Sequence, residues 1–295
     1  MRCRLSLLVL LLLCAACTAS AAPAPAAHAE APAPFISPER FEQLRTQGAT
    51  VVDARTRSQF EAEHVPGAVS APWQDFVDGS MTGLLADTAA LQERVRKLGV
   101  VADKPVVVYG SWNDAWGEEG RILWMLQYLG HPDVSLLAGG IHNYERLGFP
   151  LTQATVNVAP SRFVVAPREE LRATAEEVLE ATRQDRVVVL DIREAHEYEG
   201  ATPYGSQRGG HVPTAVNFHW KQVFDASGQL LPVATLRSRF EALGIRSDSL
   251  VIAYCTGGIR SGFMYAVMRA AGYEQAQNYD GSWWEWSQRT DLPIE

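Results

Sequence analysis

The chain has 295 residues, of which 47% are hydrophobic and 20% are charged, a composition typical of globular domains and not of disordered or fibrous proteins. Its formal net charge is -8 and its sequence pI is near 5.4. No lysine- or arginine-rich run follows the N-terminus, so the sequence lacks the electrostatic footprint of a nucleic-acid-binding protein. We therefore expect a protein of two modest domains with no nucleic-acid partner.

The N-terminus has the features of a secretory signal peptide. Two early arginines precede an apolar run at residues 5–13, which is too short to cross a membrane as a stable helix. Small residues then suit cleavage after residue 22, or as late as residue 29, and the alanine- and proline-rich residues 23–34 predict a linker. We expect an exported, periplasmic protein. Lipidation at Cys17 is the alternative, and only that would make it a membrane-anchored lipoprotein.

The rest of the chain contains a duplicated pattern. A Ser or Thr suited to cap a helix precedes an amphipathic segment, a β-branched run ending in Asp-x-Arg, and then His-Val-Pro. Strands alternating with helical stretches predict an α/β fold with two units, each a mostly parallel sheet flanked by helices. We place these units at residues 35–152 and 163–295, joined by a polar linker at 153–162. The matching motif residues are Asp53, Arg55 and His64 in the first copy and Asp191, Arg193 and His211 in the second.

The two copies differ at two places. The strand that ends at Gly110 in the first copy ends at Cys255 in the second, and no other cysteine follows residue 17, so the mature chain can form no internal disulfide. The interval from the motif arginine to the histidine is nine positions in the first copy and 18 in the second. The added residues, within 200–210, predict a loop over Cys255 or a surface loop of no consequence. Arg208 in this loop is either a solvated side chain or a group that binds a substrate carboxylate.

The stretch "YCTGGIRSG" predicts an anion-binding loop at the end of a buried strand, where α/β sheets place their ligands. Its glycines let the backbone amides turn inward, and a helix follows, so amides and helix dipole would lower the pKa of the thiol. The thiolate is the nucleophilic form of cysteine. Two arginines, one in the loop and Arg193 on the neighbouring strand, would bind an anionic substrate. The loop consists of Cys255, Thr256, Gly257, Gly258, Ile259 and Arg260.

Together these motifs resemble those of the tandem-domain sulfurtransferases of the rhodanese family. Asp-x-Arg, "GHVPTAV", the cysteine loop and "DGSWWEW" occur in the family's order, and the resemblance covers residues 35–295. It implies two rhodanese-fold domains, a degenerate first and a catalytic second, in which Cys255 cycles through a persulfide. It also implies that Arg193 binds the substrate and that residues 256–260 cradle its anionic group. No cofactor or metal is expected.

The resemblance implies transfer of sulfane sulfur from a small anionic donor to cyanide or a thiol. Thiosulfate is the favoured donor, although Gly257 stands where thiosulfate-using members often carry lysine. Thr256-Gly257 also departs from the Gly-Ser of mercaptopyruvate-using members, so 3-mercaptopyruvate remains the alternative donor. A sulfur-relay module that hands its persulfide to a thiol of a partner protein is a further alternative. Four residues separate Cys255 from Arg260, one fewer than in a related group of phosphatases, which disfavours phosphatase activity.

Other conspicuous residues have simpler interpretations. Both copies carry the His-Val-Pro histidine, including the copy without a cysteine, so we expect a structural role and not a general base or zinc ligand. The tryptophans of "DGSWWEW" are expected in the core or at the domain interface. Trp112 and Trp116, near the start of the first copy's loop, would line the cleft between the domains or cap their own helix.

Overall fold

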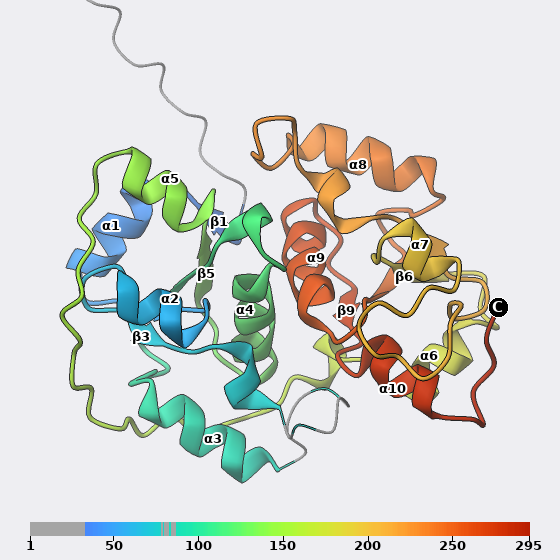
Figure 1. Cartoon of the computed structure of the whole chain (residues 1–295), viewed down its shortest axis with the longest axis horizontal. Coiled ribbons are helices and arrows are strands. Elements are labelled where there is room, and N and C mark those ends of the chain that lie inside the picture. Colours follow the sequence, from blue (N-terminus) through green and yellow to red (C-terminus); the bar gives the residue numbers. More distant parts are fainter. Residues whose placement is uncertain (1–32, 78, 80–82, 84–86) are drawn as a thin grey trace, which may run out of the picture.

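The computed structural model describes residues 33–77, 79, 83 and 87–295. They form two α/β units that lie side by side, each with a parallel sheet flanked by helices (Figure 1). The predicted α/β fold with two tandem units is therefore confirmed. The signal-like segment, Cys17 and nearly all of the 23–34 linker lie outside the described residues. Within the described part, no helix is long and apolar enough to cross a membrane.

The first unit is built on a sheet with the strand order β1-β5-β4-β2-β3, in which every neighbouring pair is parallel. Its central strands are runs of β-branched residues, which suit a sheet covered on both faces. The strands are β1 (Phe35–Ile36), β2 (Thr50–Asp53), β3 (Val69–Ser70), β4 (Val106–Tyr109) and β5 (Val134–Leu137). The helices are α1 (Pro38–Thr46), α2 (Arg57–Ala62), η1 (Trp73–Phe76), α3 (Thr88–Lys97), η2 (Trp112–Asp114), α4 (Glu118–Tyr128) and α5 (Gly140–Arg146).

The second unit has the parallel strand order β7-β6-β8-β9. As the sequence predicts, Thr174 caps the first α-helix of this unit by accepting a hydrogen bond from the Glu177 amide. The strands are β6 (Val187–Asp191), β7 (Val216–Asn217), β8 (Leu250–Tyr254) and β9 (Ala276–Asn278). The helices are η3 (Glu169–Leu171), α6 (Ala175–Ala181), α7 (Ala195–Tyr198), η4 (Trp220–Val223), α8 (Val233–Ala242), α9 (Ile259–Ala270) and α10 (Ser282–Gln288).

The two units meet through helices α4 and α9, which lie next to each other at the centre of the molecule (Figure 1). The helices approach closely because glycines face the partner at the contact. A Cβ on Gly120 would lie 2.2 Å from the Phe263 Cα, and one on Gly262 would lie 2.7 Å from the Arg121 Cα. Buried Trp112 of the first unit also donates from Nε1 to the Gly228 carbonyl of the second, at 2.9 Å. The first unit is thereby held against the loop that contains Cys255.

Candidate active site

Cys255 follows strand β8 directly and precedes helix α9, at the carboxyl edge of the second sheet. Gly258, in the left-handed conformation with φ 80°, turns the chain into the helix. The Gly258 amide donates to the Cys255 Sγ at 3.1 Å, and the Cys255 amide donates to the Ser282 Oγ at 3.1 Å. The sulfur therefore lies at the positive end of a 12-residue helix.

The electrostatic surroundings of Cys255 favour the thiolate. Burial alone would raise the pKa of the thiol, because a charge is costly away from water. The Arg260 guanidinium, hydrogen bonds from Ser261 and the loop amides outweigh this effect, so the pKa lies below its usual value. A lowered pKa increases the fraction of thiolate at a given pH, and the thiolate is the nucleophilic form.

Arg260 forms a buried ion pair with Glu197 of helix α7. The guanidinium donates from Nη1 to Oε2 at 2.7 Å and from Nη2 to Oε1 at 3.0 Å, and both side chains are almost fully buried. Thr256 joins this pair by donating from Oγ1 to Glu197 Oε1 at 2.6 Å. Burial raises the pKa of Glu197, but Arg260 and Thr256 more than reverse that effect. The carboxylate is thus ionised and offsets the charge of the loop arginine.

Sequence reasoning missed Glu197, although the duplication contained a signal for it. Glu197 and Gln59 occupy the same place in the two copies, four residues after the arginine of Asp-x-Arg. Each is the third residue of its helix and closes a capping box there. The copy that has the cysteine and the loop arginine therefore carries the acidic Glu197, and the other copy carries the neutral Gln59.

Helix α10, from the predicted "DGSWWEW" motif, fixes the cysteine loop from one side. The Trp283 amide donates to the Cys255 carbonyl at 3.0 Å, and the Trp284 amide donates to the Thr256 carbonyl at 2.8 Å. The Trp284 ring packs on the loop so closely that a Cβ on Gly257 would lie 2.3 Å from its Cζ3 atom. A lysine at position 257 would therefore have to displace the Trp284 ring.

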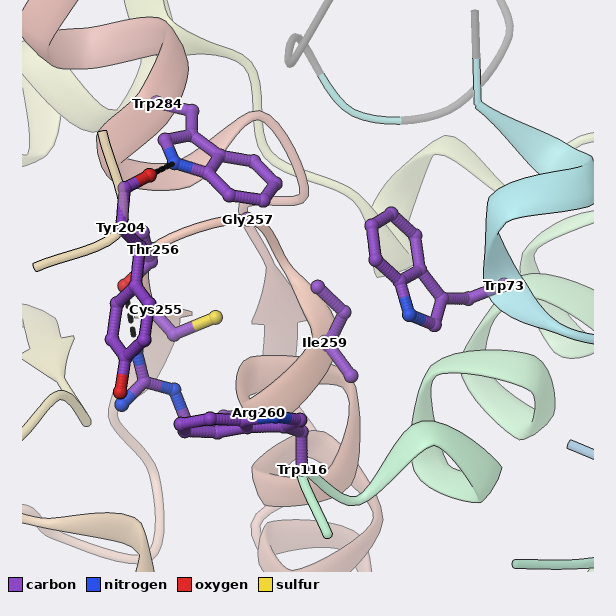
Figure 2. A pocket seen from close by; sticks show the side chains of 9 residues that line it. All are labelled: Trp73, Trp116, Tyr204, Cys255, Thr256, Gly257, Ile259, Arg260 and Trp284. Carbon is purple, nitrogen blue, oxygen red and sulfur yellow. Dashed lines mark hydrogen bonds between the residues drawn. The ribbon is translucent and has the colours of Figure 1, made fainter. Parts of the chain in front are cut away.

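Cys255 opens onto a cavity of about 190 Å³ between the two units. Its Sγ points toward the space between Trp116, Ile259 and Trp284, and Trp73 faces it from the first unit (Figure 2). The first unit thus contributes two tryptophans to the walls of a cavity that holds the second unit's thiol. The lining residues are Trp73, Trp116, Tyr204, Cys255, Thr256, Gly257, Ile259, Arg260 and Trp284.

The insertion at residues 200–210 lies over Cys255, as one of the two sequence interpretations expected, and contributes Tyr204 to the cavity. Arg208 holds the insertion in place, with its guanidinium donating to carbonyls at the end of α10, including Ser287 at 2.9 Å. The Trp284 Nε1 also donates to the Tyr204 carbonyl at 3.0 Å. Arg208 is therefore neither solvated nor directed at a ligand, because it caps a helix C-terminus.

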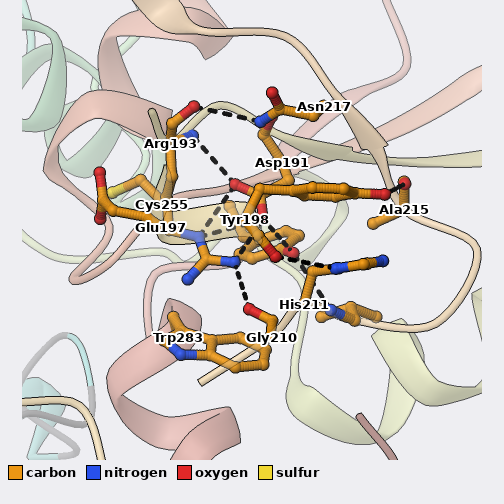
Figure 3. A network of polar contacts seen from close by, with 12 residues as sticks. Asp191, Arg193, Glu197, Tyr198, Gly210, His211, Ala215, Asn217, Cys255 and Trp283 are labelled. Atoms are coloured by element: carbon orange, nitrogen blue, oxygen red, sulfur yellow. Dashed lines mark hydrogen bonds and ion pairs between the residues drawn. The ribbon is translucent and has the colours of Figure 1, made fainter. Parts of the chain in front are cut away.

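Both Asp-x-Arg motifs form the same buried network (Figure 3 shows the second). Arg193 pairs with Asp191 at 2.6 Å and donates to the Gly210 carbonyl at 2.8 Å. In the first unit Arg55 pairs with Asp53 at 2.6 Å and donates to the Glu63 carbonyl at 2.7 Å. A tyrosine at the end of the neighbouring strand, Tyr109 or Tyr254, donates to the aspartate in each network.

Of the predicted site residues, Arg193 and Gly258 are not among the described residues that line the cavity. Arg193 is 1% exposed, and its guanidinium lies over the Trp283 ring. Since the same ion pair occurs in the unit without a cysteine, the geometry favours a structural role. Gly258 contacts the sulfur through its amide, and the other predicted loop residues line the cavity.

The two histidines of His-Val-Pro occupy equivalent structural positions. His64 stacks on Phe60 with ring centroids 3.9 Å apart, and His211 stacks on Tyr198 at 3.6 Å. Each Nδ1 lies within hydrogen-bond distance of the carbonyl of the residue on which the ring stacks. These contacts agree with the predicted structural role. In the described part of the chain, no group of three or more His, Cys, Asp or Glu residues is arranged to hold a metal ion.

In the first unit, a carboxylate occupies the place of the missing thiol. A Cβ built on Gly110 would lie 2.1 Å from the Glu119 Oε2 atom. Glu119 is fully buried, and burial, together with nearby Glu118, raises the pKa of Glu119 to about 8. At neutral pH this side chain is therefore mostly protonated, and it fills the first unit's loop.

Comparison with known proteins agrees with this geometry. The family described as "Rhodanese-like domain" matches residues 37–147 and 174–289. The sulfur carrier protein TtuD of Thermus thermophilus is 33% identical over 80% of this chain and 86% of its own. A thiosulfate sulfurtransferase of Pseudomonas aeruginosa is 31% identical over 83% of this chain and 90% of its own. Another of that name, from Corynebacterium glutamicum, is 29% identical over 86% and 87%.

Solved structures show the same architecture. The anaerobic ergothioneine biosynthesis enzyme from Chlorobium limicola matches with a TM-score of 0.81 at 19% identity, over 88% of this chain and 69% of that one. The structure of YnjE matches with a TM-score of 0.80 at 20% identity, over 88% and 67%. At these identities the likeness concerns the fold alone. The family match covers both units, so the chain belongs to the rhodanese family and is a sulfurtransferase with two tandem rhodanese-like domains.

Proposed function

We propose that the protein transfers sulfane sulfur from thiosulfate to a thiol or cyanide through a persulfide on Cys255. The observation that carries this proposal is the environment of Cys255. Its thiol has a lowered pKa, accepts a hydrogen bond from a loop amide at a helix N-terminus, and faces a cavity open to solvent. Relatives that carry the name thiosulfate sulfurtransferase, at about 30% identity, support this choice of donor.

In the first half-reaction, the Cys255 thiolate attacks the outer sulfur of thiosulfate. The sulfur–sulfur bond of the donor breaks, and sulfite leaves with the bonding electron pair. The enzyme keeps a persulfide that carries the single negative charge of the original thiolate. The loop amides and the dipole of helix α9 hold the negative charge throughout. Arg260 adds to this field. Arg193 supports the strand and does not touch the donor.

Two related functions use the same persulfide. 3-Mercaptopyruvate is the alternative donor, although the cavity contains no cation besides Arg260 for its carboxylate among the described lining residues. Transfer of the sulfur to a partner protein is the other alternative. A 33% identical relative that is named as a sulfur carrier protein supports it. A protein acceptor would be recognised by transfer of sulfur to that protein without measurable turnover of free thiols or cyanide.

The test of the proposed function compares the wild-type protein with Cys255→Ser. After incubation with thiosulfate, the wild type should release sulfite and gain the mass of one sulfur atom, and the serine variant should do neither. Incubation with 3-mercaptopyruvate in parallel decides between the two donors. Persistent sulfite release by the serine variant would place the nucleophile elsewhere and overturn the proposal.

We also propose that the protein acts after export, in the periplasm. The support is the arginine-flanked apolar run at residues 5–13 and the small residues that follow it. A mass for the purified native protein that begins at residue 23 or 30 would support signal cleavage, and a lipid mass on Cys17 would indicate the lipoprotein form. A retained Met1 would contradict both.

A further inference from the structure

Four of the nine residues that line the cavity above Cys255 are aromatic, and they come from both units and from the insertion (Figure 2). Trp116 and Tyr204 are 41% and 37% exposed, among the most exposed large hydrophobic side chains in the described part of the chain. Their rings meet edge to face with centroids 5.3 Å apart. Exposed aromatic side chains at the mouth of a cavity commonly mark a binding surface.

The charges at this mouth argue against an anionic ligand in the outer part of the cavity. Arg260 is the only cation among the described residues that line it, and Glu197 offsets its charge through two hydrogen bonds. The loop amides face the sulfur at the base and not the rim. Thiosulfate can reach the sulfur, but the aromatic walls offer it no partner.

The same charges argue against a cationic ligand between the rings. Aromatic rings that face each other often bind an ammonium group. Here the protein's own guanidinium takes that position, because Arg260 lies over the Trp116 ring at 5.2 Å and over the Tyr204 ring at 5.7 Å. What remains in front of the sulfur is apolar space bounded by Ile259 and Trp284, and about 190 Å³ is enough for one six-membered ring.

From this geometry we infer an acceptor subsite for a flat, uncharged aromatic thiol. The inference rests on the proposed function, since it concerns the second half-reaction of the same cysteine. The acceptor's thiolate attacks the outer sulfur of the Cys255 persulfide, the bond between that sulfur and Sγ breaks, and the electron pair returns to Sγ. The proton that the acceptor thiol gives up goes to the transferred sulfur, so the products are an aryl-bearing hydropersulfide and the Cys255 thiolate. No oxidant or reductant is required.

The experiment compares two acceptors, phenylmethanethiol and propane-1-thiol, with persulfide-loaded enzyme. Each rate is expressed per concentration of acceptor thiolate, because the benzylic thiol is the more acidic of the two. Contacts with two rings predict that kcat/KM for phenylmethanethiol exceeds that for propane-1-thiol by about tenfold. The ratio should fall toward one in Trp116→Leu and in Tyr204→Leu. It should persist in Tyr204→Phe, the matched control that keeps the ring.

Using a ratio within each variant cancels any general loss of activity or folding. A wild-type ratio near one, or a ratio that both leucine variants leave unchanged, would overturn the aromatic subsite. Cysteamine, a cationic aliphatic thiol, should be no better than propane-1-thiol, and a clear preference for it would also contradict the inference. Persulfide loading is measured beforehand by mass, so a protein that never loads sulfur refutes the proposed function and not the subsite.

Discussion

Replacing Glu197 by Gln tests whether the buried carboxylate restrains the cysteine loop. The substitution removes one negative charge and keeps the side chain's size and its hydrogen bond with Thr256. In the wild type, Glu197 offsets Arg260, which is the strongest factor that lowers the pKa of Cys255. Without this negative charge, the Arg260 guanidinium acts on the sulfur unopposed, so the pKa of the thiol should fall further below its usual value.

The assay is the rate of Cys255 alkylation by iodoacetamide as a function of pH, since only the thiolate reacts. The midpoint for the wild type should lie below that of a free cysteine, and that for Glu197→Gln lower still. KM for thiosulfate should fall as well, because Arg260 then meets the anion with its full charge.

The free energy of unfolding should also fall in Glu197→Gln. Removing one partner of a buried ion pair costs about 3–5 kcal/mol of unfolding free energy, so the variant is studied well below its Tm. Glu177→Gln is the matched control, because Glu177 holds the same capping-box position in α6. The control should leave the alkylation profile unchanged. An alkylation midpoint that rises in Glu197→Gln would refute the view that Glu197 offsets the loop charge.

Three further substitutions separate structural from functional contacts. Arg193→Lys should lower the free energy of unfolding in urea by about 3 kcal/mol and leave KM for thiosulfate nearly unchanged; a large rise in KM with intact stability would restore Arg193 to the site. Gly257→Ala should displace the Trp284 ring, change the tryptophan fluorescence and cost about 1–3 kcal/mol in the same titration; unaltered fluorescence would contradict the contact. Arg208→Ala should release the insertion, which faster amide hydrogen exchange at residues 200–210 would report, whereas unchanged exchange would mean that other contacts hold it.

The parts of this structure that the sequence predicts are those fixed by local pattern. An apolar run followed by Cys255, a glycine-rich loop and a helix places the thiol at the carboxyl edge of a parallel sheet. The duplication was equally informative, because each copy checks the other. The duplication also bears on Arg193, to which the family resemblance assigned substrate binding. The same Asp–Arg ion pair occurs in the first unit, beside Gly110, where there is no thiol. The pair is therefore better explained as support for the fold.

The parts that could not be predicted depend on contacts between distant segments. Trp73 and Trp116 reach the cavity because α4 and α9 pack through their glycines, and no local pattern specifies that packing. Tyr204 reaches it because the insertion is bonded to α10, about 80 residues further on. Such contacts arise from tertiary packing, which the sequence determines only as a whole.

The Glu119 side chain beneath Gly110 bears on any attempt to engineer a second reactive thiol into this protein. A cysteine introduced at position 110 would meet Glu119 in the space that its own side chain needs. Such a thiol therefore calls for a second substitution, at Glu119, or for movement of that side chain. As it stands, the first domain serves its neighbour by supplying two tryptophans to the walls of the cavity that holds Cys255.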